Sequence, residues 1–465
     1  MKNAPTAGLF AIALGAATCL ALPESALGWV TTGRDLISQD CVDNTGCLDI
    51  PGSIKEPGFP QKITVSGSYA LSSNLTVPKE KSEGGGKVAA IEIDIDSNSL
   101  GPNNVTIHLN GFTIRHEDAN DNGCIFGTAG DEISNPFGGI SILGGPGTNV
   151  RIVGGTIHGF GYGILAKGAS VQVEDMYLCG NNTGVWAGPG SIIRNSRILG
   201  HYDDAIKLEH IEFGGGLLPI ASIIEDNVIS GTSHLTNNMN GDCIDLKGDK
   251  VKIWDNVISD CQGYGIFAKC DGCDDAAGAN VLIGENVITN NVAGGVFVDG
   301  GGANILNNMI SMNGGDGVLT HDHSRIFDNT IEMNGGFGLN LGAEQNTGGA
   351  DSPGDVDGHK SAWGNNVITG NNLSADIEDQ VNPPIDNSND PAKCPAPGAD
   401  QKGAPVSDPM KPAPPFGNAG GNVVAGYALA PSSCCGNGIV EGNEHCDDGD
   451  ADNADGCDAR CLLTQ

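Results

Sequence analysis

A pattern of short apolar runs recurs about every 21 residues between about Asn149 and about Gly342, and it limits the fold more than any other feature. Each copy contains three runs, cut by Gly and Asn, in which apolar residues alternate with other residues. In the first copy the apolar positions are Val150 and Ile152, then Ile157, then Ile164 and Ala166. Runs this short with period two are strands too short for a β-sandwich. Their fixed return predicts a solenoid, in which a coil buries its apolar side only by stacking on the next coil.

One asparagine recurs two residues before the apolar position of the second run. In successive copies it is Asn227, Asn256, Asn286, Asn308, Asn329 and Asn366. Stacked side-chain amides hydrogen-bond from one layer to the next, as in cross-β ladders. We therefore expect an inward asparagine ladder at a turn of each coil, in a parallel β-helix without α-helices.

The repeated coils resemble the parallel β-helix repeats of the pectin-lyase-like superfamily. YALSSNLTV at residues 69–77 and NVTIHLNGFTI at 104–114 also resemble the opening coils of its secreted members. The resemblance covers about two thirds of the chain. It implies an all-β fold, a right-handed parallel β-helix that forms a three-sided solenoid of about ten coils. The cysteines near the C-terminus add a small disulfide-rich C-terminal module to this fold.

The rest of the chain divides by composition. Lys2 precedes an apolar stretch at residues 7–22, followed by small residues before Trp29, as in an export signal, and no other stretch is long enough to span a membrane. We therefore expect a bacterial extracellular protein, secreted or on the cell surface. The expected segments are a signal peptide at 1–28, an N-terminal cap region at 29–60, the parallel β-helix at 61–375, a Pro/Gly/Asp-rich closing segment or linker at 376–432, and a cysteine-rich module at 433–465.

The cysteine count suits an oxidising compartment. Of the 15 cysteines, Cys19 lies in the signal, which leaves an even number in the mature chain. We expect Cys41 and Cys47 to form a disulfide in the cap. Cys270 and Cys273 form a CxxC pattern, and a local disulfide is favoured because no second CxxC completes a zinc site.

The C-terminal run CCGNGIVEGNEHCDDGDADNADGCDARC at residues 434–461 resembles the myxococcal-type cysteine-rich repeat of secreted and surface proteins. The resemblance implies a module held by disulfides, since about 30 residues have almost no core, and it suggests association with the cell surface. The cysteines concerned are Cys435, Cys446, Cys457 and Cys461. A calcium loop is a further hypothesis for Asp450, Asp452 and Asp455, although the glutamate of an EF-hand is missing and solvated acidic loops explain them equally well.

The charge of the chain limits its partners. With 57 acidic and 23 basic residues, the formal net charge is −34. This balance excludes nonspecific nucleic-acid binding. It also repels polyanions, so a uronic-acid or sulfated polymer would need a local basic patch or bridging divalent cations.

Candidate functional residues lie on the outer face of the third run, where alternation turns two positions per coil toward solvent. We call these positions the outer stripe. They are Leu165 and Lys167, Trp186 and Gly188, Lys207 and Glu209, Asp245 and Lys247, Phe267 and Lys269, Phe297 and Asp299, Leu319 and His321, and Asn340 and Gly342. The turns just before the third run add Asp203, Asp204, Asp242 and Tyr264. Three expanded loops, between residues 206 and 222, 229 and 244, and 266 and 281, border the charged coils and would form the walls of a groove.

Two reactions on an extracellular polysaccharide fit these residues. In β-elimination, Lys207, Lys247 or Lys269 would be the base. Its calcium ligands would come from Asp203, Asp204, Asp242 and Asp245. In hydrolysis, two of Asp204, Asp242 and Asp245 would be the acid and base. Glu209, Tyr264, Phe267 and Phe297 are the candidate substrate contacts.

The segments YDDAIKL, NGDCIDLKG and GYGIFAK resemble the polygalacturonase motif series at Asp204 and Asp242. They depart from it at Gly241, where that series has a second aspartate, and at Tyr264, where it has a histidine.

The alternative is a noncatalytic surface or matrix β-helix, an adhesin or glycan-binding rod, because a fold alone does not establish a function. On that hypothesis the lysines and carboxylates are a solvated face. An enzyme should bring Asp204, Asp242 and a lysine to a common point in a groove, whereas a structural rod should keep the charges apart.

Overall fold

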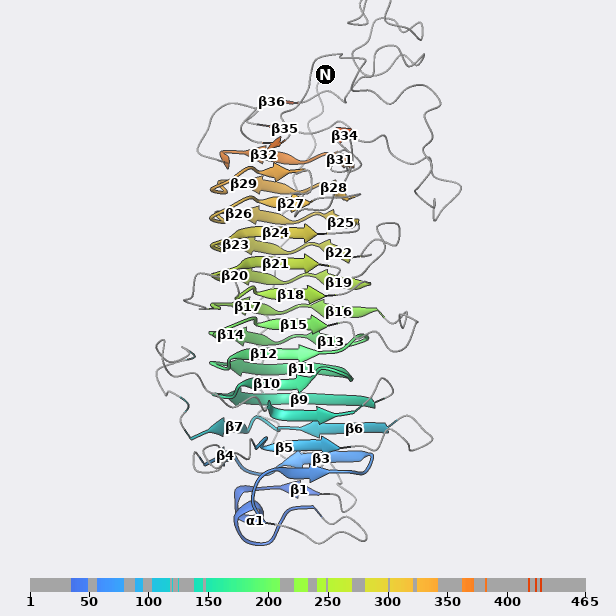
Figure 1. Ribbon diagram of the computed structural model, residues 1–465, viewed down its shortest axis with the longest axis vertical. Coiled ribbons are helices and arrows are strands. Elements are labelled where there is room, and N and C mark those ends of the chain that lie inside the picture. The colour runs from blue at the N-terminus through green and yellow to red at the C-terminus, as the bar shows by residue number, and fades with distance from the viewer. Residues whose placement is uncertain are drawn as a thin grey trace, which may run out of the picture. The chain divides into compact units, whose positions relative to one another are not determined.

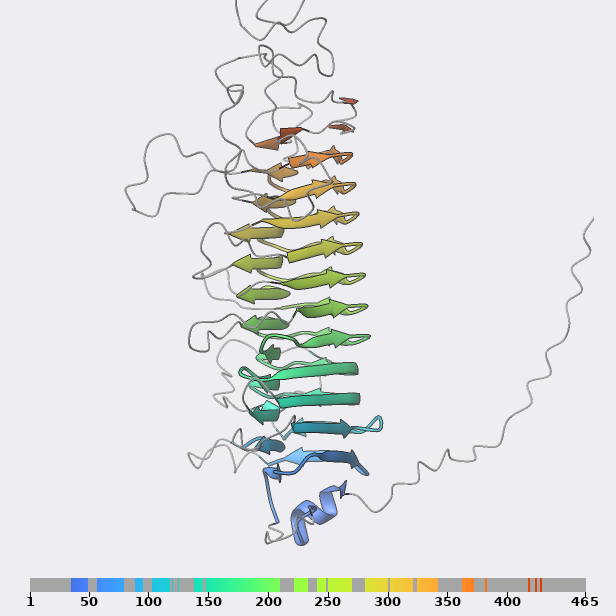
Figure 2. The same cartoon turned by 90° about the vertical axis from the view of Figure 1, so that its right-hand side faces the viewer.

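Each coil of this protein follows the same path, because the apolar positions of the sequence become inward side chains of parallel strands. In the computed structural model the described residues are 35–48, 57–78, 88–94, 103–117, 119, 124, 138–144, 148–209, 221–232, 241–247, 250–269, 281–299, 302–320, 324–341, 362–371, 381–382, 417–418, 423–424 and 427–428. The predicted signal peptide lies outside these residues. Figures 1 and 2 show the strands succeeding one another along one axis in chain order.

One strand of each coil belongs to a 12-stranded parallel sheet. Its members are β2 (Gln61–Ile63), β5 (Ile91–Asp94), β8 (Gly138–Leu143), β10 (Tyr162–Ala166), β12 (Thr183–Ala187), β15 (Ile206–Glu209), β18 (Ile244–Lys247), β21 (Tyr264–Lys269), β24 (Gly294–Asp299), β27 (Val318–Thr320), β30 (Leu339–Asn340) and β33 (Val381–Asn382).

The other strands form a 24-stranded sheet made of two ladders, which join where β9 (Thr148–His158) and β11 (Ser170–Cys179) run through both. The first ladder contains β1 (Leu36–Ile37), β3 (Gly67–Leu71), β6 (Asn103–His108), β9, β11, β13 (Ile192–Arg194), β16 (Ser222–Glu225), β19 (Val251–Trp254), β22 (Val281–Gly284), β25 (Ala303–Leu306), β28 (Arg325–Phe327), β31 (Ala362–Gly364) and β34 (Gly417–Asn418). The second contains β4 (Leu75–Val77), β7 (Thr113–His116), β9, β11, β14 (Arg197–Leu199), β17 (Val228–Ser230), β20 (Val257–Ser259), β23 (Val287–Thr289), β26 (Met309–Ser311), β29 (Thr330–Glu332), β32 (Val367–Thr369) and β35 (Val423–Val424), and β36 (Tyr427–Ala428) pairs antiparallel with β35.

Two details differ from the sequence-based expectation. A short helix, α1 (Gln39–Asn44), lies in the cap region, where Ser38 caps it by accepting a hydrogen bond from the Cys41 backbone N–H. The helix depends on this local capping, which the repeat pattern does not report. Strands β33 to β35 fall within residues 376–432, and each pairs with a strand of the preceding coil, so part of the segment expected to be irregular continues the sheets. Among the described residues no helix combines the length and apolarity that a membrane crossing requires.

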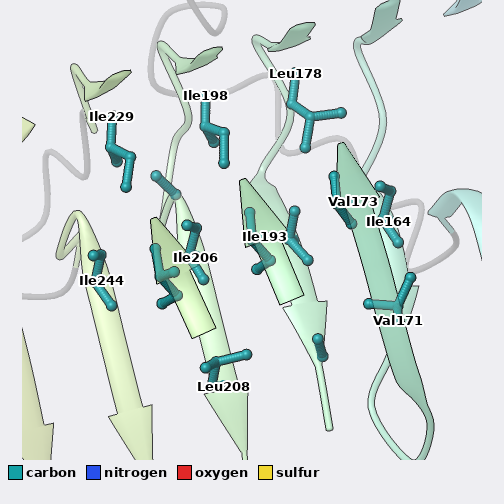
Figure 3. Packing of buried hydrophobic residues seen from close by; sticks show 14 of the residues in the cluster. Ile164, Val171, Val173, Leu178, Ile193, Ile198, Ile206, Leu208, Ile229 and Ile244 are labelled. Atoms are coloured by element: carbon teal, nitrogen blue, oxygen red, sulfur yellow. The ribbon is translucent and has the colours of Figure 1, made fainter. Parts of the chain in front are cut away.

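The core is a set of aliphatic columns that run from coil to coil. Ile164, Val185, Ile206, Ile244, Ile266, Val296, Val318 and Leu339 are consecutive partners in the register of the 12-stranded sheet, and all are fully buried. Figure 3 shows part of this packing, with Ile206 and Ile244 facing Ile198 and Ile229 of the other sheet. Each such side chain contributes roughly 1.5–3 kcal/mol by leaving water, so stacking coils stabilises a core that one coil could not form.

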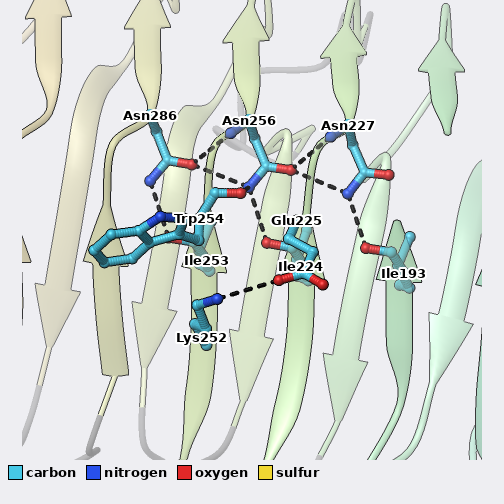
Figure 4. Close-up of polar contacts among 9 residues, drawn as sticks. All are labelled: Ile193, Ile224, Glu225, Asn227, Lys252, Ile253, Trp254, Asn256 and Asn286. Carbon is cyan, nitrogen blue, oxygen red and sulfur yellow. Dashed lines mark hydrogen bonds and ion pairs between the residues drawn. The ribbon is translucent and has the colours of Figure 1, made fainter. Parts of the chain in front are cut away.

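The predicted asparagine ladder is present. The Asn256 Oδ1 accepts hydrogen bonds from the backbone N–H and the side-chain amide of Asn227, each at 3.0 Å, and the Asn256 amide donates to Asn286 Oδ1 at 3.0 Å (Figure 4). The same contacts continue through Asn308, Asn329 and Asn366. The residue before each ladder asparagine has a left-handed backbone, for example φ 57° at Asp226 and 54° at Asp255. Aspartate and asparagine tolerate that conformation better than most residues, which explains the recurring acid–amide pairs of the sequence.

A second ladder, which the sequence analysis did not identify, follows the second strand of each later coil. It consists of Asn291, Asn313, Asn334 and Asn371, and each Oδ1 accepts from the backbone N–H of the residue one coil earlier, including Cys261. In earlier coils Asn181 and His201 occupy this column, and His201 Nδ1 accepts from the Asn181 backbone N–H at 3.3 Å. Both turns of the 24-stranded sheet are therefore held by buried polar side chains.

Replacing Asn256 by alanine should destabilise the protein strongly. The change leaves the Asn227 backbone N–H and side-chain amide, and the carbonyl of Ile224, without their buried partner. Each unsatisfied buried group costs about 1–3 kcal/mol, so we expect the free energy of unfolding to fall by about 3 kcal/mol or more. Urea unfolding measures it, and Asn304→Ala, on the outer side of β25, should change it by less than about 0.5 kcal/mol. Equal effects of the two changes would contradict the ladder as a stabilising element.

His201 should make stability decrease in mild acid. It is fully buried, and burial lowers its pKa to about 4. Between about pH 4 and pH 6.5 the unfolded histidine binds a proton that the folded one does not, so the free energy of unfolding falls as pH drops through this window, by about 2 kcal/mol at pH 5. His201→Asn, which supplies the amide found elsewhere in the ladder, should lose less stability than the wild type between pH 7 and pH 5 in urea unfolding. If His201→Asn loses as much stability between pH 7 and pH 5 as the wild type does, His201 is not the cause of the acid sensitivity.

Candidate functional site

The outer face of the 12-stranded sheet brings the expected residues together in the expected order. Trp186, Lys207, Asp245, Phe267 and Phe297 are consecutive partners in the register of β12, β15, β18, β21 and β24. Neighbouring strands lie about 4.8 Å apart, so these side chains form a continuous row. The first position of the outer stripe is therefore confirmed in these coils.

Lys207 links two of the candidate carboxylates. Its Nζ lies 2.9 Å from Asp204 Oδ2 and 2.7 Å from Asp245 Oδ2. The side chain of Lys207 is 17% exposed, and those of Asp204 and Asp245 are 4% and 7% exposed. Asp204 belongs to the turn before β15 and Asp245 to the neighbouring strand β18, so stacking of two coils creates the contact. We call Asp204, Lys207, Asp242 and Asp245 the acid–lysine cluster.

The turn carboxylates are held by the backbone of the following coil. Asp204 Oδ1 accepts from the Asp242 backbone N–H at 3.1 Å, and Asp242 Oδ1 accepts from the Tyr264 backbone N–H at 2.6 Å. Asp316, at the equivalent turn before β27, accepts from the Phe337 backbone N–H at 2.7 Å in the same way. This hydrogen bond is thus a structural device of the coil, and the feature particular to the cluster is the partly buried lysine between two carboxylates.

The environment shifts the protonation of the cluster. Burial, together with the negative charges of Asp203 and Asp245, raises the pKa of Asp204 to about 7, although Lys207 opposes the shift. Burial and the charge of Asp204 raise the pKa of Asp242 well above its ordinary value. Burial works against the charged form of Lys207, but Asp204 and Asp245 outweigh it and raise the pKa of the ammonium above its ordinary value. Lys207 therefore stays protonated near neutral pH and does not fit the role of a base, whereas a turn carboxyl can hold a proton there.

Aromatic side chains flank the acid–lysine cluster on both sides along the coil axis. On one side Phe267 and Phe297 stack with ring centroids 5.0 Å apart, and Tyr264 stacks on Phe297 at 5.3 Å. On the other side Trp186 contacts Tyr162 at 5.3 Å, a residue that the sequence analysis did not select. Tyr162 precedes the first apolar position of its strand by two residues, as Tyr264 does. This shared position in the repeat is the sequence feature from which Tyr162 could have been predicted to join the aromatic row. All five rings are partly exposed.

The second position of the outer stripe carries ion pairs. The Nζ of Lys167 lies 3.2 Å from Glu209 Oε2 and 4.6 Å from the Trp186 ring centroid. Lys269 Nζ lies 3.9 Å from Asp299 Oδ2. Lys247 is the register partner of both Glu209 and Lys269.

Calcium ligation by Asp203, Asp204, Asp242 and Asp245 finds no support in this arrangement. Within the described ranges no three His, Cys, Asp or Glu side chains group as metal ligands, and the Lys207 ammonium occupies the place between Asp204 and Asp245. Asp203 instead donates its backbone N–H to the Asn182 carbonyl at 2.7 Å.

Several predicted residues lie outside the described part of the chain. They are Cys270, Cys273, Cys435, Cys446, Cys457 and Cys461, the candidate calcium loop Asp450, Asp452 and Asp455, and most of the three expanded loops, at 210–220, 233–240 and 270–280. Their placement, and with it the walls of the predicted groove, stays a prediction.

Three disulfides are described. Cys41 and Cys47 pair as expected. Cys124–Cys179 and Cys243–Cys261 were not anticipated. In the second of these, Cys243 follows Asp242 directly, just before strand β18. Its partner Cys261 occupies the position of the second asparagine ladder one coil before Asn291. Such a pair is adjacent only after the chain has coiled, so cysteine spacing does not reveal it.

Comparisons with known proteins agree with the architecture. A family model for a right-handed β-helix region matches residues 222–351, and with the parallel ladders it defines the protein as a right-handed parallel β-helix. Among solved structures, a double mutant of the periplasmic alginate epimerase AlgG is 13% identical with a TM-score of 0.50, covering 75% of this chain and 81% of that chain. A second AlgG mutant is 13% identical with a TM-score of 0.46, covering 67% of this chain and 72% of that one. The Dettilon tailspike protein is 12% identical with a TM-score of 0.32, covering 67% and 60%. A comparison with curated protein sequences finds no match. At these identities the structural likeness concerns the fold alone.

Replacing Lys207 by methionine should destabilise the protein in a pH-dependent way. The change leaves Asp204 and Asp245 buried without their cation, which costs about 3–5 kcal/mol near neutral pH. A protonated carboxyl needs no counter-charge, so the loss should shrink as the pH falls through about 7, where Asp204 gains its proton. Urea unfolding at pH 7.5 and pH 5 measures this dependence.

The matched control for that variant is Lys252→Met. Lys252 pairs with Glu225 at 3.1 Å on β19 and β16, but its side chain is 38% exposed. An exposed pair of this kind contributes about 0–1 kcal/mol, so the control should be nearly neutral at both pH values. A pH-independent loss in Lys207→Met would contradict an ionised pair of carboxylates at Lys207.

Proposed function

We propose that this protein is a secreted carbohydrate-active β-helix protein that binds an extracellular polysaccharide on the outer face of the 12-stranded sheet and cleaves it at the acid–lysine cluster. The observation that carries the proposal is the cluster itself. Two carboxyl groups from neighbouring coils, those of Asp204 and Asp245, meet at Lys207, and Asp242 joins them through its backbone N–H, which donates to Asp204. Aromatic rings lie on both sides of the cluster. Carboxyl groups provide acid–base chemistry at a glycosidic bond, and rings bind the apolar faces of sugars.

Hydrolysis fits the cluster better than β-elimination. A carboxyl with a raised pKa can give its proton to the glycosidic oxygen, while a second carboxylate takes a proton from the water that adds to the sugar carbon. Asp204, whose pKa is raised to about 7, and Asp242 suit the acid role, and Asp245 suits the base role. β-Elimination would need a lysine base, and since Lys207 is held protonated, only Lys247 or Lys269 could serve.

The comparisons support the proposal only through the fold. AlgG is named as an alginate epimerase, so a protein with this architecture acts on a polysaccharide made of uronic acids. Polyuronates therefore belong in the substrate tests. Attachment to the cell surface through the C-terminal module and an extracellular location are parts of the same proposal. Calcium binding at Asp450, Asp452 and Asp455 stays a prediction, because these residues lie outside the described part of the chain.

One observation favours a noncatalytic β-helix as the second candidate. The carboxyl groups of Asp204 and Asp242 are buried and hydrogen-bonded to the next coil, as that of Asp316 is outside the cluster. If the acid–lysine cluster has only a structural role, the protein is an adhesin or a glycan-binding rod.

The test is to incubate the mature protein with neutral glycans and polyuronates, with calcium or a chelator, and to follow reducing ends together with the ultraviolet absorbance of unsaturated sugars. We expect reducing ends without new absorbance, at a rate that falls as pH rises through about 7, where Asp204 loses its proton. Asp242→Asn should lower the rate by about 100-fold or more. Asp316→Asn removes the carboxyl of the equivalent turn outside the cluster and should retain the rate.

The alternatives give different results. New ultraviolet absorbance would show β-elimination instead of hydrolysis. A rate that depends on calcium would show that a metal ion takes part in the reaction. No product from any polymer, with the protein folded, would favour the noncatalytic candidate. Equal losses in Asp242→Asn and Asp316→Asn would show that the turn carboxyl has only a structural role.

A further inference from the structure

The charges of the outer stripe and its turns do not add up to a basic surface. Four lysines, Lys167, Lys207, Lys247 and Lys269, share this face with six carboxyl groups, Glu209, Asp245 and Asp299 in the stripe and Asp203, Asp204 and Asp242 in the turns. If Asp204 and Asp242 hold protons the charges balance, and if they do not the face is negative. In neither state does it attract a polyanion, and the net charge of −34 adds long-range repulsion.

Three of these lysines also have carboxylates of the protein nearby. Lys207 lies between Asp204 and Asp245, Lys167 pairs with Glu209, and Lys269 lies near Asp299. Lys247 has Glu209 as its register partner in the adjacent strand. A substrate carboxylate would have to compete with a carboxylate of the protein for Lys167, Lys207 and Lys269.

Three buried polar atoms of the stripe lack hydrogen-bond partners among the described residues. One of them, Glu209 Oε2, lies 3.2 Å from the Lys167 ammonium, whereas the other two atoms make no ion pair there. One is Asp245 Oδ1, on a side chain that is 7% exposed, and it can only accept a hydrogen bond while the group is ionised. The other is Trp186 Nε1, which can only donate. Their residues stand on either side of Lys207 in the register. Leaving such atoms unpaired costs about 1–3 kcal/mol each, so a ligand that satisfies both gains specificity.

The carboxylate of a uronic acid can satisfy only the donor of this pair, so the charged group of such a sugar gains nothing at Asp245 Oδ1. Sugar hydroxyl and acetamido groups offer both a donor and an acceptor, so a neutral glycan can satisfy both atoms. The aromatic rings beyond them, Tyr162 with Trp186 on one side and Phe267 with Phe297 on the other, suit the apolar faces of sugars that carry no charge.

From these contacts we infer that the glycan bound along the outer stripe is uncharged, with Trp186 donating to it and Asp245 accepting from it. The inference rests on the proposed function and names the substrate class of the same site. The inferred substrate class differs from the alginate in the name of the structural neighbour AlgG. A shared fold does not imply a shared pattern of charges on this face.

Affinity electrophoresis and calorimetry on the mature protein test the inference with three sets of probes. The neutral set is mixed-linkage β-glucan, galactomannan and pullulan, the anionic set is alginate and polygalacturonate, and the cationic set is chitosan oligosaccharides. We expect binding to at least one neutral polymer, with an affinity that changes less than about twofold between roughly 0.05 and 0.5 M salt, since screening acts only on charged partners.

Trp186→Ala and Asp245→Asn should each weaken that binding by roughly tenfold or more. The matched control is Trp254→Ala, because Trp254 is also an outward tryptophan with a lysine near its ring, Lys252 at 5.4 Å, but lies on β19 of the other sheet. The control should bind as the wild type does. Thermal unfolding of each variant checks that a loss of binding is not a loss of fold, and Trp186→Ala remains informative if Asp245→Asn is unstable.

Each other outcome is decisive. Preferred binding of alginate, polygalacturonate or chitosan, weakened by Trp186→Ala, would overturn the uncharged class and leave the proposed carbohydrate function intact. Neutral binding that is insensitive to both stripe variants would overturn the assignment of the site. No binding and no turnover of any probe would overturn the inference together with the proposed function.

Discussion

Hydrogen bonding from each coil to the next is the interaction on which the rest of this structure depends. The backbone ladders of the two sheets fix the spacing, and the asparagine columns fix the turns, because each amide satisfies a backbone N–H and another amide one coil away (Figure 4). A coil that shifted by one residue would leave these buried donors unpaired and turn its isoleucines toward water. The ladders therefore set the register, and the register places every outward side chain.

The acid–lysine cluster follows from that register. Asp204 and Asp245 are 41 positions apart in the sequence, yet stacking brings Lys207 within 2.9 Å of both carboxylates. The same stacking places aromatic rings one and two coils away on either side. A linear row of this kind, on a rigid support, suits a linear polymer better than a small molecule, which is why the carbohydrate proposal follows from the geometry as well as from the fold.

Structural and functional roles overlap at the turns. Asp316 shows that an aspartate there can serve only to hold the next coil. Asp204 and Asp242 hold the next coil in the same way, but burial and neighbouring negative charges also raise their pKa values. The Lys207 ammonium also forms an ion pair with Asp245. The difference between a turn and a candidate site is thus one partly buried lysine, and this makes Asp316 the appropriate reference for the Asp242→Asn test.

Much of the fold could be predicted from the sequence, since local periodicity and the recurring asparagines report directly which residues face inward. The order of residues along the outer stripe could be predicted for the same reason, because a fixed period aligns Trp186, Lys207, Asp245 and Phe267. The cap helix α1 and the strands within 376–432 could not, as they depart from the repeat. By itself the sequence determined the coils, their register and the candidate face. Only the tertiary structure decided which charges pair, that Lys207 is held protonated, and that Cys243 meets Cys261, because burial and contacts between coils depend on distances that spacing along the chain does not contain.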